Sequence, residues 1–119
     1  MRPNQRLIAV AASLLVLTQA RGHHAVTANY LEDVGTIEGV VVEVFWSNPH
    51  VHIYVEVTDA QGQVNLWDIE STNLNGMASA GWTRDTVEVG DRIRASGRLG
   101  REGRARLALQ LPSVEILDP

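Results

Sequence analysis

The sequence contains no cysteine among its 119 residues, and every one of its ten basic residues is an arginine. The absence of cysteine excludes disulfide bonds, thiolate metal ligands and a lipid-modified cysteine behind an export signal. The sequence also lacks a G-x-S-x-G nucleophile elbow, a glycine-rich phosphate loop and a helical H-x-x-x-H zinc pair. We therefore expect a protein that is not an enzyme and that holds no structural zinc.

The first 22 residues have the pattern of a secretory signal peptide. Arg2 and Arg6 precede an apolar run over residues 7–17. A membrane-spanning helix needs about 18 or more apolar residues, so this run is too short to remain as an anchor. The pattern predicts a periplasmic or secreted protein with no stable membrane anchor after cleavage.

The small residues before the expected cleavage point decide where the mature chain starts. Ala20 and Gly22 stand three positions and one position before a cut that leaves His23 first, as signal peptidases prefer. A cut after Ala20 is the alternative, and it would leave Arg21 first. We expect the first cut, which makes residues 23–119 one small domain.

Charge is distributed very unevenly along residues 23–119. This segment holds seven arginines and fourteen acidic residues, a formal net charge of −7. Residues 23–83 contain eight acids and no basic residue, and all seven arginines lie within residues 84–106. A nucleic-acid-binding protein needs a basic footprint over most of one face, so we expect no nucleic-acid partner. The acidic half should attract cations.

From Val34 onward the sequence predicts β-strands separated by turn residues. β-Branched residues dominate residues 36–46, where Gly39 indicates a bulge or bend, and apolar residues alternate strictly along residues 50–58. Further strands are expected over residues 63–70, within residues 86–97 and over residues 105–117, where Pro112 indicates an edge or a bulge.

A short helix is expected between the third and fourth strands. Residues 71–82 combine possible N-cap residues with an apolar helical spacing and a closing glycine. Three strands, a short helix and two strands are the order of an all-β, five-stranded OB-like barrel. A small β-sandwich is the alternative. The expected core consists of Ile37, Val41, Val51, Ile53, Val55, Val57, Ile69, Ile93, Leu107, Leu109 and Ile116.

The four histidines of the expected mature chain form two pairs and are the candidate metal ligands. His23 and His24 stand at its N-terminus, while His50 and His52 share one face of the second strand, about 7 Å apart. The α-amine and ring nitrogen of an N-terminal histidine suit Cu(II), and His50 or His52 would add a third nitrogen. The pattern predicts a copper-binding or copper-handling protein. Alternatively, all four histidines are inert surface or structural residues.

Aromatic residues suggest a second, metal-free hypothesis. Trp46, Tyr54 and Trp67 are candidate ligand-binding residues of an OB-type adaptor that binds a protein, a peptide or a glycan. Packing in the core or at a barrel end is the alternative role of the tryptophans. Asp68 and Glu70 alternate on one face of the third strand, where carboxylates are more often simple surface charges than an acid–base pair.

Several short motifs together resemble a known family. They are His23-His24, WSNPH over residues 46–50, WDIE over residues 67–70, and GWTR over residues 81–84 followed by Gly90-Asp91. In this combination the chain resembles the exported bacterial proteins of the DUF6152 family over nearly its whole mature length. The resemblance implies export and a small β-barrel, and it brings no established activity.

Overall fold

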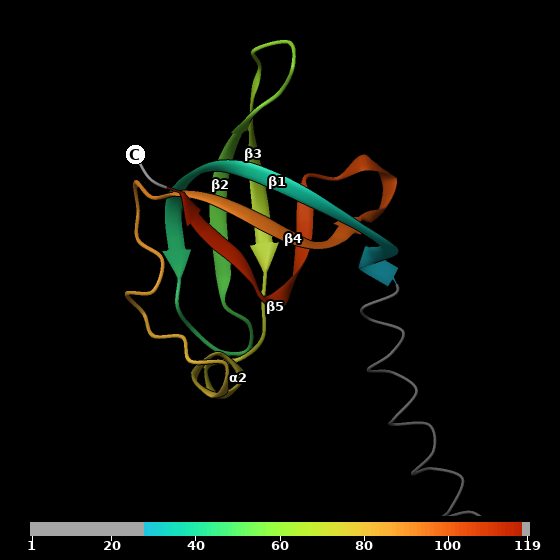
Figure 1. The fold of residues 1–119 in the computed structure, drawn as a ribbon. Coiled ribbons are helices and arrows are strands. Elements are labelled where there is room, and N and C mark those ends of the chain that lie inside the picture. Colours follow the sequence, from blue (N-terminus) through green and yellow to red (C-terminus); the bar gives the residue numbers. More distant parts are fainter. Residues whose placement is uncertain (1–27, 118–119) are drawn as a thin grey trace, which may run out of the picture.

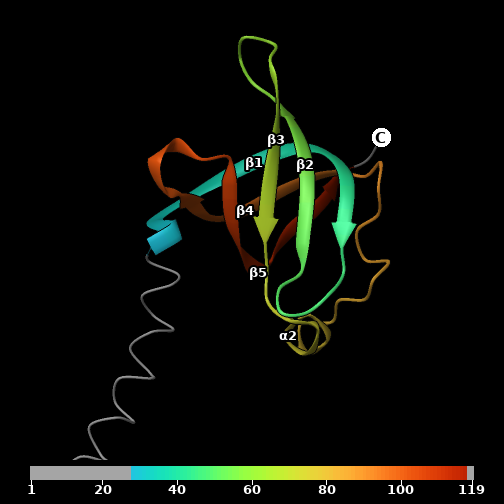
Figure 2. The same cartoon turned by 180° about the vertical axis from the view of Figure 1, so that it is seen from behind.

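The computed structural model describes residues 28–117, which form one barrel with a short helix beneath it (Figures 1 and 2). The expected signal peptide, His23 and His24 lie outside the described residues. The elements are β1 (Tyr30–Phe45), β2 (His52–Thr58), β3 (Val64–Glu70), α2 (Leu74–Ser79), β4 (Arg92–Gly100), a 3₁₀ turn (Arg101–Gly103) and β5 (Arg106–Leu117).

The five strands close into one barrel in the order β1-β2-β3-β5-β4. All neighbouring strands are antiparallel except β3 and β5, which are parallel over Asp68–Glu70 and Arg106–Ala108. This order, with the helix between β3 and β4, confirms the predicted OB-like barrel. The alternative sandwich is wrong, because a single sheet closes on itself.

The first strand is longer than the sequence indicated. It begins at Tyr30 and pairs with β4 up to Val40, from where it pairs with β2 up to Phe45. Gly39 lies where β1 crosses from one partner to the other. An added Cβ atom there would lie 2.2 Å from the carbonyl oxygen of Glu56, so only glycine permits this approach. The break in the β1–β2 register follows at Val41–Glu43 rather than at Gly39.

The barrel interior contains most of the predicted core. Buried as expected are Ile37, Val41, Val51, Ile53, Val55, Ile69, Ile93 and Leu107. Val57 and Leu109 are only partly buried and pack against this cluster. The prediction for Ile116 is wrong, since its exposure is 51 %. At that point β5 pairs with β4, beyond its short contact with β3, and no element within residues 28–117 buries the side chain of Ile116.

The helix closes one end of the barrel and holds the loop between β1 and β2. Asn73 caps the helix by accepting a hydrogen bond from the backbone N–H of Gly76 at 2.8 Å. The side chain of Asn48 accepts a hydrogen bond from the N–H of Leu74 at 2.9 Å. Met77 on the helix and Trp82 after it are buried against the core. The predicted short helix is therefore confirmed. Its hydrogen bond with Asn48 fixes the position of the turn over residues 48–50, which we name the NPH turn.

The last strand contains the irregularity that its proline indicated. The β4–β5 register shifts between Ala95 and Gly97, opposite the stretch of β5 between Leu109 and Val114 that contains Pro112.

Within the described residues, no helix is long and apolar enough to cross a membrane.

Candidate functional site

A carboxylate on β3 connects the start of β1 with the NPH turn. Oε2 of Glu70 accepts a 2.5 Å hydrogen bond from the hydroxyl of Tyr30, and Oε1 lies 2.5 Å from Nδ1 of His50. Tyr30 is buried, with 4 % of its surface exposed, whereas the side chain of His50 is half exposed. Backbone hydrogen bonds join Val51 to Ser71 and Thr72, which hold the residue after His50 beside the end of β3.

A second histidine–carboxylate pair lies beside the first on the same outer face. Nδ1 of His52 lies 2.7 Å from Oδ1 of Asp68. The ring of His52 stacks on Tyr54, with centroids 6.1 Å apart, and meets the edge of Phe45 at 6.3 Å. These contacts follow from the strand registers, which place Phe45, His52 and Glu70 in one row and Glu43, Tyr54 and Asp68 in the next.

Arg106, at the start of β5, lies next to both carboxylates. Its Nη2 atom donates a 3.0 Å hydrogen bond to Oε2 of Glu70, and its Nε atom lies 3.8 Å from Oδ2 of Asp68. Its guanidinium carbon lies 5.4 Å from the centre of the Tyr30 ring. This arginine therefore offsets part of the negative charge that the two carboxylates place behind the histidines.

The pKa shifts follow from these contacts. Partial burial favours the neutral form of Glu70, but hydrogen bonds from Tyr30 and His50 and the nearby histidines outweigh it, so the pKa of Glu70 lies below its usual value. Burial, the hydrogen bond to Glu70 and the charge of that carboxylate raise the pKa of Tyr30 well above its usual value. At neutral pH, Glu70 is an acceptor and Tyr30 is a donor.

The hydrogen bonds orient both imidazole rings. An ionised carboxylate only accepts hydrogen bonds, so the Nδ1 atoms of His50 and His52 carry the protons. Neither Nε2 atom has a hydrogen-bond partner among residues 28–117, and in the neutral ring this atom has a lone pair for a ligand. Metal-binding histidines are held in the same way, by a carboxylate behind the ring.

Beside His50 the surface is hollowed. The hollow has a volume of about 240 Å³ and is lined by Tyr30, His50, Glu70, Ser71, Thr72, Ala108 and Leu109. Within the described part of the chain, no three histidine, aspartate or glutamate side chains are grouped so that they alone could hold a metal ion. A metal at His50 would therefore need ligands from outside residues 28–117.

The aromatic candidates lie in different surroundings. Trp46 and Trp67 are partly buried and pack against the core, whereas Tyr54 stacks on His52 on the outer face. The sequence pattern indicated that His52, Asp68 and Glu70 lie on strand faces, as observed, but not that the histidines pair with the carboxylates. The prediction that His50 lies on the second strand is wrong, because β2 begins at His52 and His50 belongs to the turn before it. Tyr30 and Arg106 were missed, because their chain segments meet β3 only through the barrel closure.

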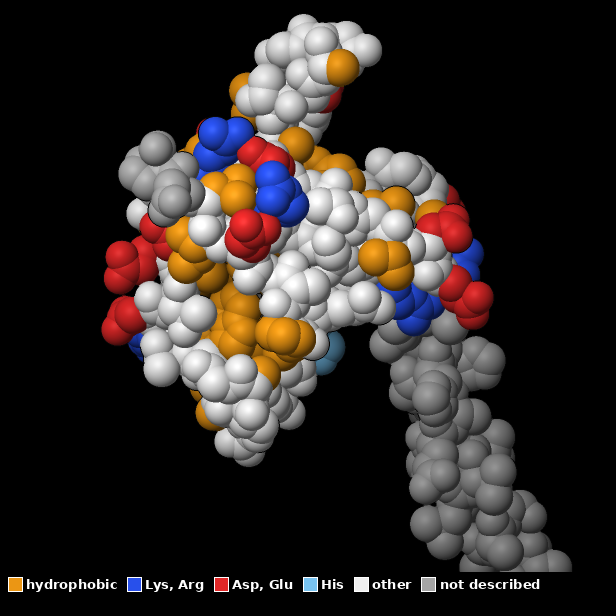
Figure 3. All heavy atoms as spheres, in the orientation of Figure 1, with side chains coloured by type: hydrophobic (Ala, Val, Ile, Leu, Met, Phe, Trp, Pro, Cys, Tyr) orange, Lys and Arg blue, Asp and Glu red, His pale blue; other side chains and the backbone are white. Residues whose placement is uncertain are grey.

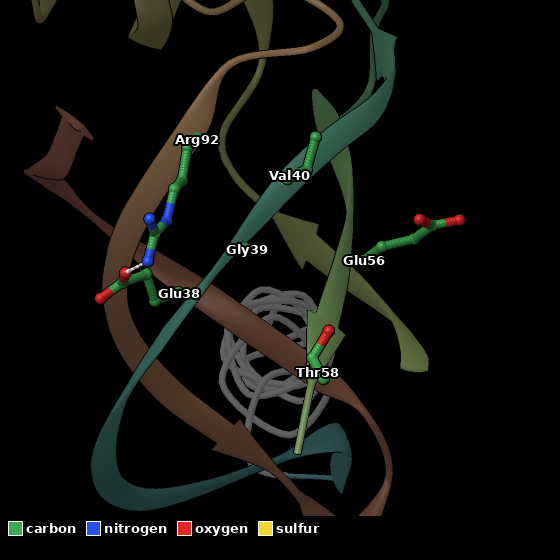
Figure 4. A pocket seen from close by; sticks show the side chains of 6 residues that line it. All are labelled: Glu38, Gly39, Val40, Glu56, Thr58 and Arg92. Carbon is green, nitrogen blue, oxygen red and sulfur yellow. Dashed lines mark hydrogen bonds and ion pairs between the residues drawn. The ribbon is translucent and has the colours of Figure 1, made fainter. Parts of the chain in front are cut away.

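A second, larger hollow lies at the crossing of β1, away from the histidines. Its volume is about 490 Å³, and its lining comprises Glu38, Gly39, Val40, Glu56, Thr58 and Arg92. Figure 4 shows Glu38 and Arg92 on one side of β1 and Glu56 and Thr58 on the other, with no side chain at Gly39 between them. The Arg92 guanidinium donates a 2.5 Å hydrogen bond to Glu38.

These features define an OB-like barrel with a histidine–carboxylate site on the outer face of β2 and β3. A model of the family of unknown function DUF6152 matches residues 11–108, and the chain belongs to this family. No curated protein shows a significant match to it.

The fold is also similar to that of the mitochondrial single-stranded DNA-binding protein Rim1 from S. cerevisiae. Two crystal forms of Rim1 match with TM-scores of 0.53 and 0.52 at 15 % and 14 % sequence identity. Each match covers 71 % of this chain, and 92 % and 94 % of the respective Rim1 chains. At this identity the similarity concerns the fold alone.

Proposed function

We propose that the protein is an exported copper-binding protein of the periplasm or extracellular space, in which the N-terminal His23 chelates Cu(II) and His50 completes the site. The observation that carries this proposal is the shared carboxylate of Glu70. One of its oxygens holds Tyr30, at the start of β1, and the other holds His50.

The position of Tyr30 brings the expected N-terminus within reach of His50. His23 precedes Tyr30 by seven residues, and an extended chain of that length spans about 25 Å. Because Tyr30 shares the carboxylate of His50, the tail needs only a fraction of this reach. His52, on the same outer face as His50, is a further nitrogen donor, and His24 follows His23 in the sequence.

The chemistry of the donors supports copper. An α-amine and imidazole nitrogens suit Cu(II), which binds most tightly among divalent first-row ions. The Nδ1–carboxylate hydrogen bonds of His50 and His52 fix the rings with Nε2 as the ligating atom. The excess of acidic residues over residues 23–83 attracts a cation electrostatically.

We infer binding rather than catalysis, since the polar groups of the site are hydrogen-bonded to one another. Glu70 is bound by Tyr30, His50 and Arg106, which leaves no carboxylate oxygen of this residue free to act as a base. Binding of nucleic acid by the same face is disfavoured by Asp68 and Glu70, whose charges repel phosphate.

The test is a titration of the chain that begins at His23 with Cu(II), followed by calorimetry and by EPR of the bound copper. We expect one Cu(II) per chain and an EPR spectrum of nitrogen ligation. His50→Ala should change this spectrum and weaken binding at least tenfold. Acetylation of the N-terminal amine of His23 should do the same, because it removes the amine nitrogen from the chelate.

Two variants make the result specific. Gln61→Ala, in the turn between β2 and β3, removes an exposed side chain away from the histidines and should leave copper binding unchanged. His52→Ala distinguishes which strand histidine ligates the metal. If the acetylated chain bound copper as tightly as the chain with a free amine at His23, the terminal chelate would be refuted.

A further inference from the structure

The outer face of β1, β2 and β3 carries exposed apolar side chains next to acidic ones. In the registers, Val40, Glu56 and Leu66 form one row, and Glu43 and Tyr54 belong to the next. We name as the hairpin face the six residues Val40, Val42, Glu43, Tyr54, Glu56 and Leu66. Three of them are exposed apolar residues, with exposures of 42 % for Val40, 37 % for Val42 and 57 % for Leu66.

The acidic side chains of the hairpin face are not neutralised. Glu43 and Glu56 are exposed and have no hydrogen bond or ion pair within residues 28–117. The pKa of Tyr54 is raised by partial burial first, and then by the charges of Asp68 and Glu43. The face therefore combines an apolar surface with an unbalanced negative field.

The nearest arginines are engaged elsewhere. Arg92 pairs with Glu38, and Arg94 bridges Glu38 and Glu115 at 3.2 and 3.0 Å. Figure 3 shows such basic and acidic side chains next to one another near the C-terminal end of the described chain. These ion pairs leave no spare positive charge for Glu43 or Glu56.

The hollow at Gly39 extends this face. Glu56 and Val40 belong both to the hairpin face and to the lining of the 490 Å³ hollow. In Figure 4 the carboxylate of Glu56 points away from the Glu38–Arg92 pair, on the other side of β1. A long cationic side chain that lies beside Gly39 would meet Thr58 and Glu56 on their side of β1, where the carboxylate of Glu56 is unpaired, whereas Glu38 on the other side is already paired with Arg92.

We propose that the hairpin face binds an extended segment of another protein that carries apolar and cationic side chains in turn at every second position, so that both kinds point to the same side. The apolar residues of such a segment would cover Val40, Val42 and Leu66. Its cationic residues would meet Glu43 and Glu56. In an extended chain only every second side chain points to a given side, so the apolar and cationic residues that contact the face stand two positions apart. The site uses neither His50 nor Glu70 and is independent of copper.

The charge pattern selects this occupant. An anionic polymer such as nucleic acid would be repelled by Glu43 and Glu56, and a purely apolar partner would leave both carboxylates buried without a partner. A cationic and apolar segment satisfies both properties of the face at once.

The test uses a ten-residue peptide with blocked ends, Ser-Leu-Ser-Lys-Ser-Leu-Ser-Lys-Ser-Leu, in which leucine and lysine point to the same side of the extended chain. The peptide is added to the 15N-labelled chain in the presence of EDTA. We expect NMR shift changes centred on Val40, Val42, Tyr54 and Leu66. A peptide with glutamate in place of each lysine should cause none. The double variant Glu43→Gln/Glu56→Gln should weaken binding of the lysine peptide at least tenfold, and Leu66→Ser should weaken it at least threefold.

A charge-matched control is available near the start of β1. Glu32→Gln/Asp33→Asn removes two exposed carboxylates at least seven residues along the strand from Val40 and should change the affinity less than twofold. Equal weakening by both double variants, shift changes centred elsewhere, equal binding of the glutamate peptide, or the absence of binding would each overturn the proposal. Circular dichroism verifies that each variant is folded.

Discussion

The hydroxyl of Tyr30 donates a 2.5 Å hydrogen bond to Glu70, and this contact joins two strands that are not neighbours in the barrel. Tyr30 starts β1 and Glu70 ends β3. The bond therefore holds the first residue of β1 next to His50, whose ring is held by the other oxygen of the same carboxylate.

Replacement of Tyr30 by phenylalanine tests this contact. The change removes a buried hydrogen bond to an ionised group while Arg106 continues to serve Glu70, so we expect a loss of about 1–2 kcal/mol in the free energy of unfolding. Because Tyr30 would no longer be hydrogen-bonded to the carboxylate that holds His50, we also expect the copper affinity to fall several-fold. Urea denaturation and Cu(II) titration measure the two effects.

A second variant on the same strand provides the control. Thr36→Val breaks the exposed 2.7 Å hydrogen bond between Thr36 and Ser96 without touching the site. We expect a stability change within about 0.5 kcal/mol and unchanged copper affinity. If Tyr30→Phe behaved like Thr36→Val in both measurements, the contact with Glu70 would have no role in positioning the tail.

Neighbouring positions on β2 should respond very differently to a charge. Ile53 is 1 % exposed inside the barrel, and Ile53→Asp would bury an unpaired carboxylate. The cost of several kcal/mol is comparable to the whole stability of a small domain, about 5–15 kcal/mol, so the domain should unfold. Tyr54→Asp, on the outer face, should remain folded. Circular dichroism and thermal melting distinguish the two, and equal damage would contradict the one-sided burial of β2.

Gly39 should tolerate no side chain. Gly39→Ala would place a Cβ atom 2.2 Å from the carbonyl oxygen of Glu56, and we expect a loss of about 3 kcal/mol. Gly62, in the turn between β2 and β3, has a φ of +79° but open space around it, so Gly62→Ala should cost only about 1 kcal/mol. Chemical denaturation of both variants gives the comparison. A smaller loss at position 39 than at position 62 would show that β1 does not approach Glu56 so closely.

The ion pairs of Glu38 should make stability depend on pH. Hydrogen bonds from Arg92, and then from Arg94, lower the pKa of Glu38 below 4.5 despite some desolvation. A lowered pKa in the folded state stabilises the fold above the unfolded value, and this contribution is lost as the pH falls through the folded value. The melting temperature of the wild-type chain should therefore exceed that of Glu38→Gln at pH 6.5, and the difference should shrink as the pH is lowered below 4.5 towards pH 3.

Glu102 gives the comparison for this titration. Its ion pair with Arg104, at 3.4 Å, is largely exposed, so Glu102→Gln should have almost the same melting temperature as the wild-type chain at both pH values. A wild-type advantage over Glu38→Gln that persisted unchanged at pH 3 would rule out titration of Glu38 as its cause.

The order of the elements could be predicted from the sequence, because it depends on local patterns. The strict alternation around Ile53 identified β2 and its buried face, and the turn at Gly90 separated the helix region from β4. The start of β1 could not be predicted in this way. Tyr30 is followed by Glu32 and Asp33, and acidic residues are uncommon in strands, so the sequence pattern did not predict a strand there. Pairing with β4 stabilises this part of β1.

The sequence by itself determined which side chains of β2 and β3 face outward, because alternation along a strand depends only on the backbone. It thus placed His52 on one strand face and Asp68 and Glu70 on another, whereas His50 lies in the turn before β2. Only the tertiary structure decided that these faces are one, that each ring is held by a carboxylate, and that Tyr30 and Arg106 join them. These contacts depend on strand register and barrel closure, which bring together residues up to 40 positions apart.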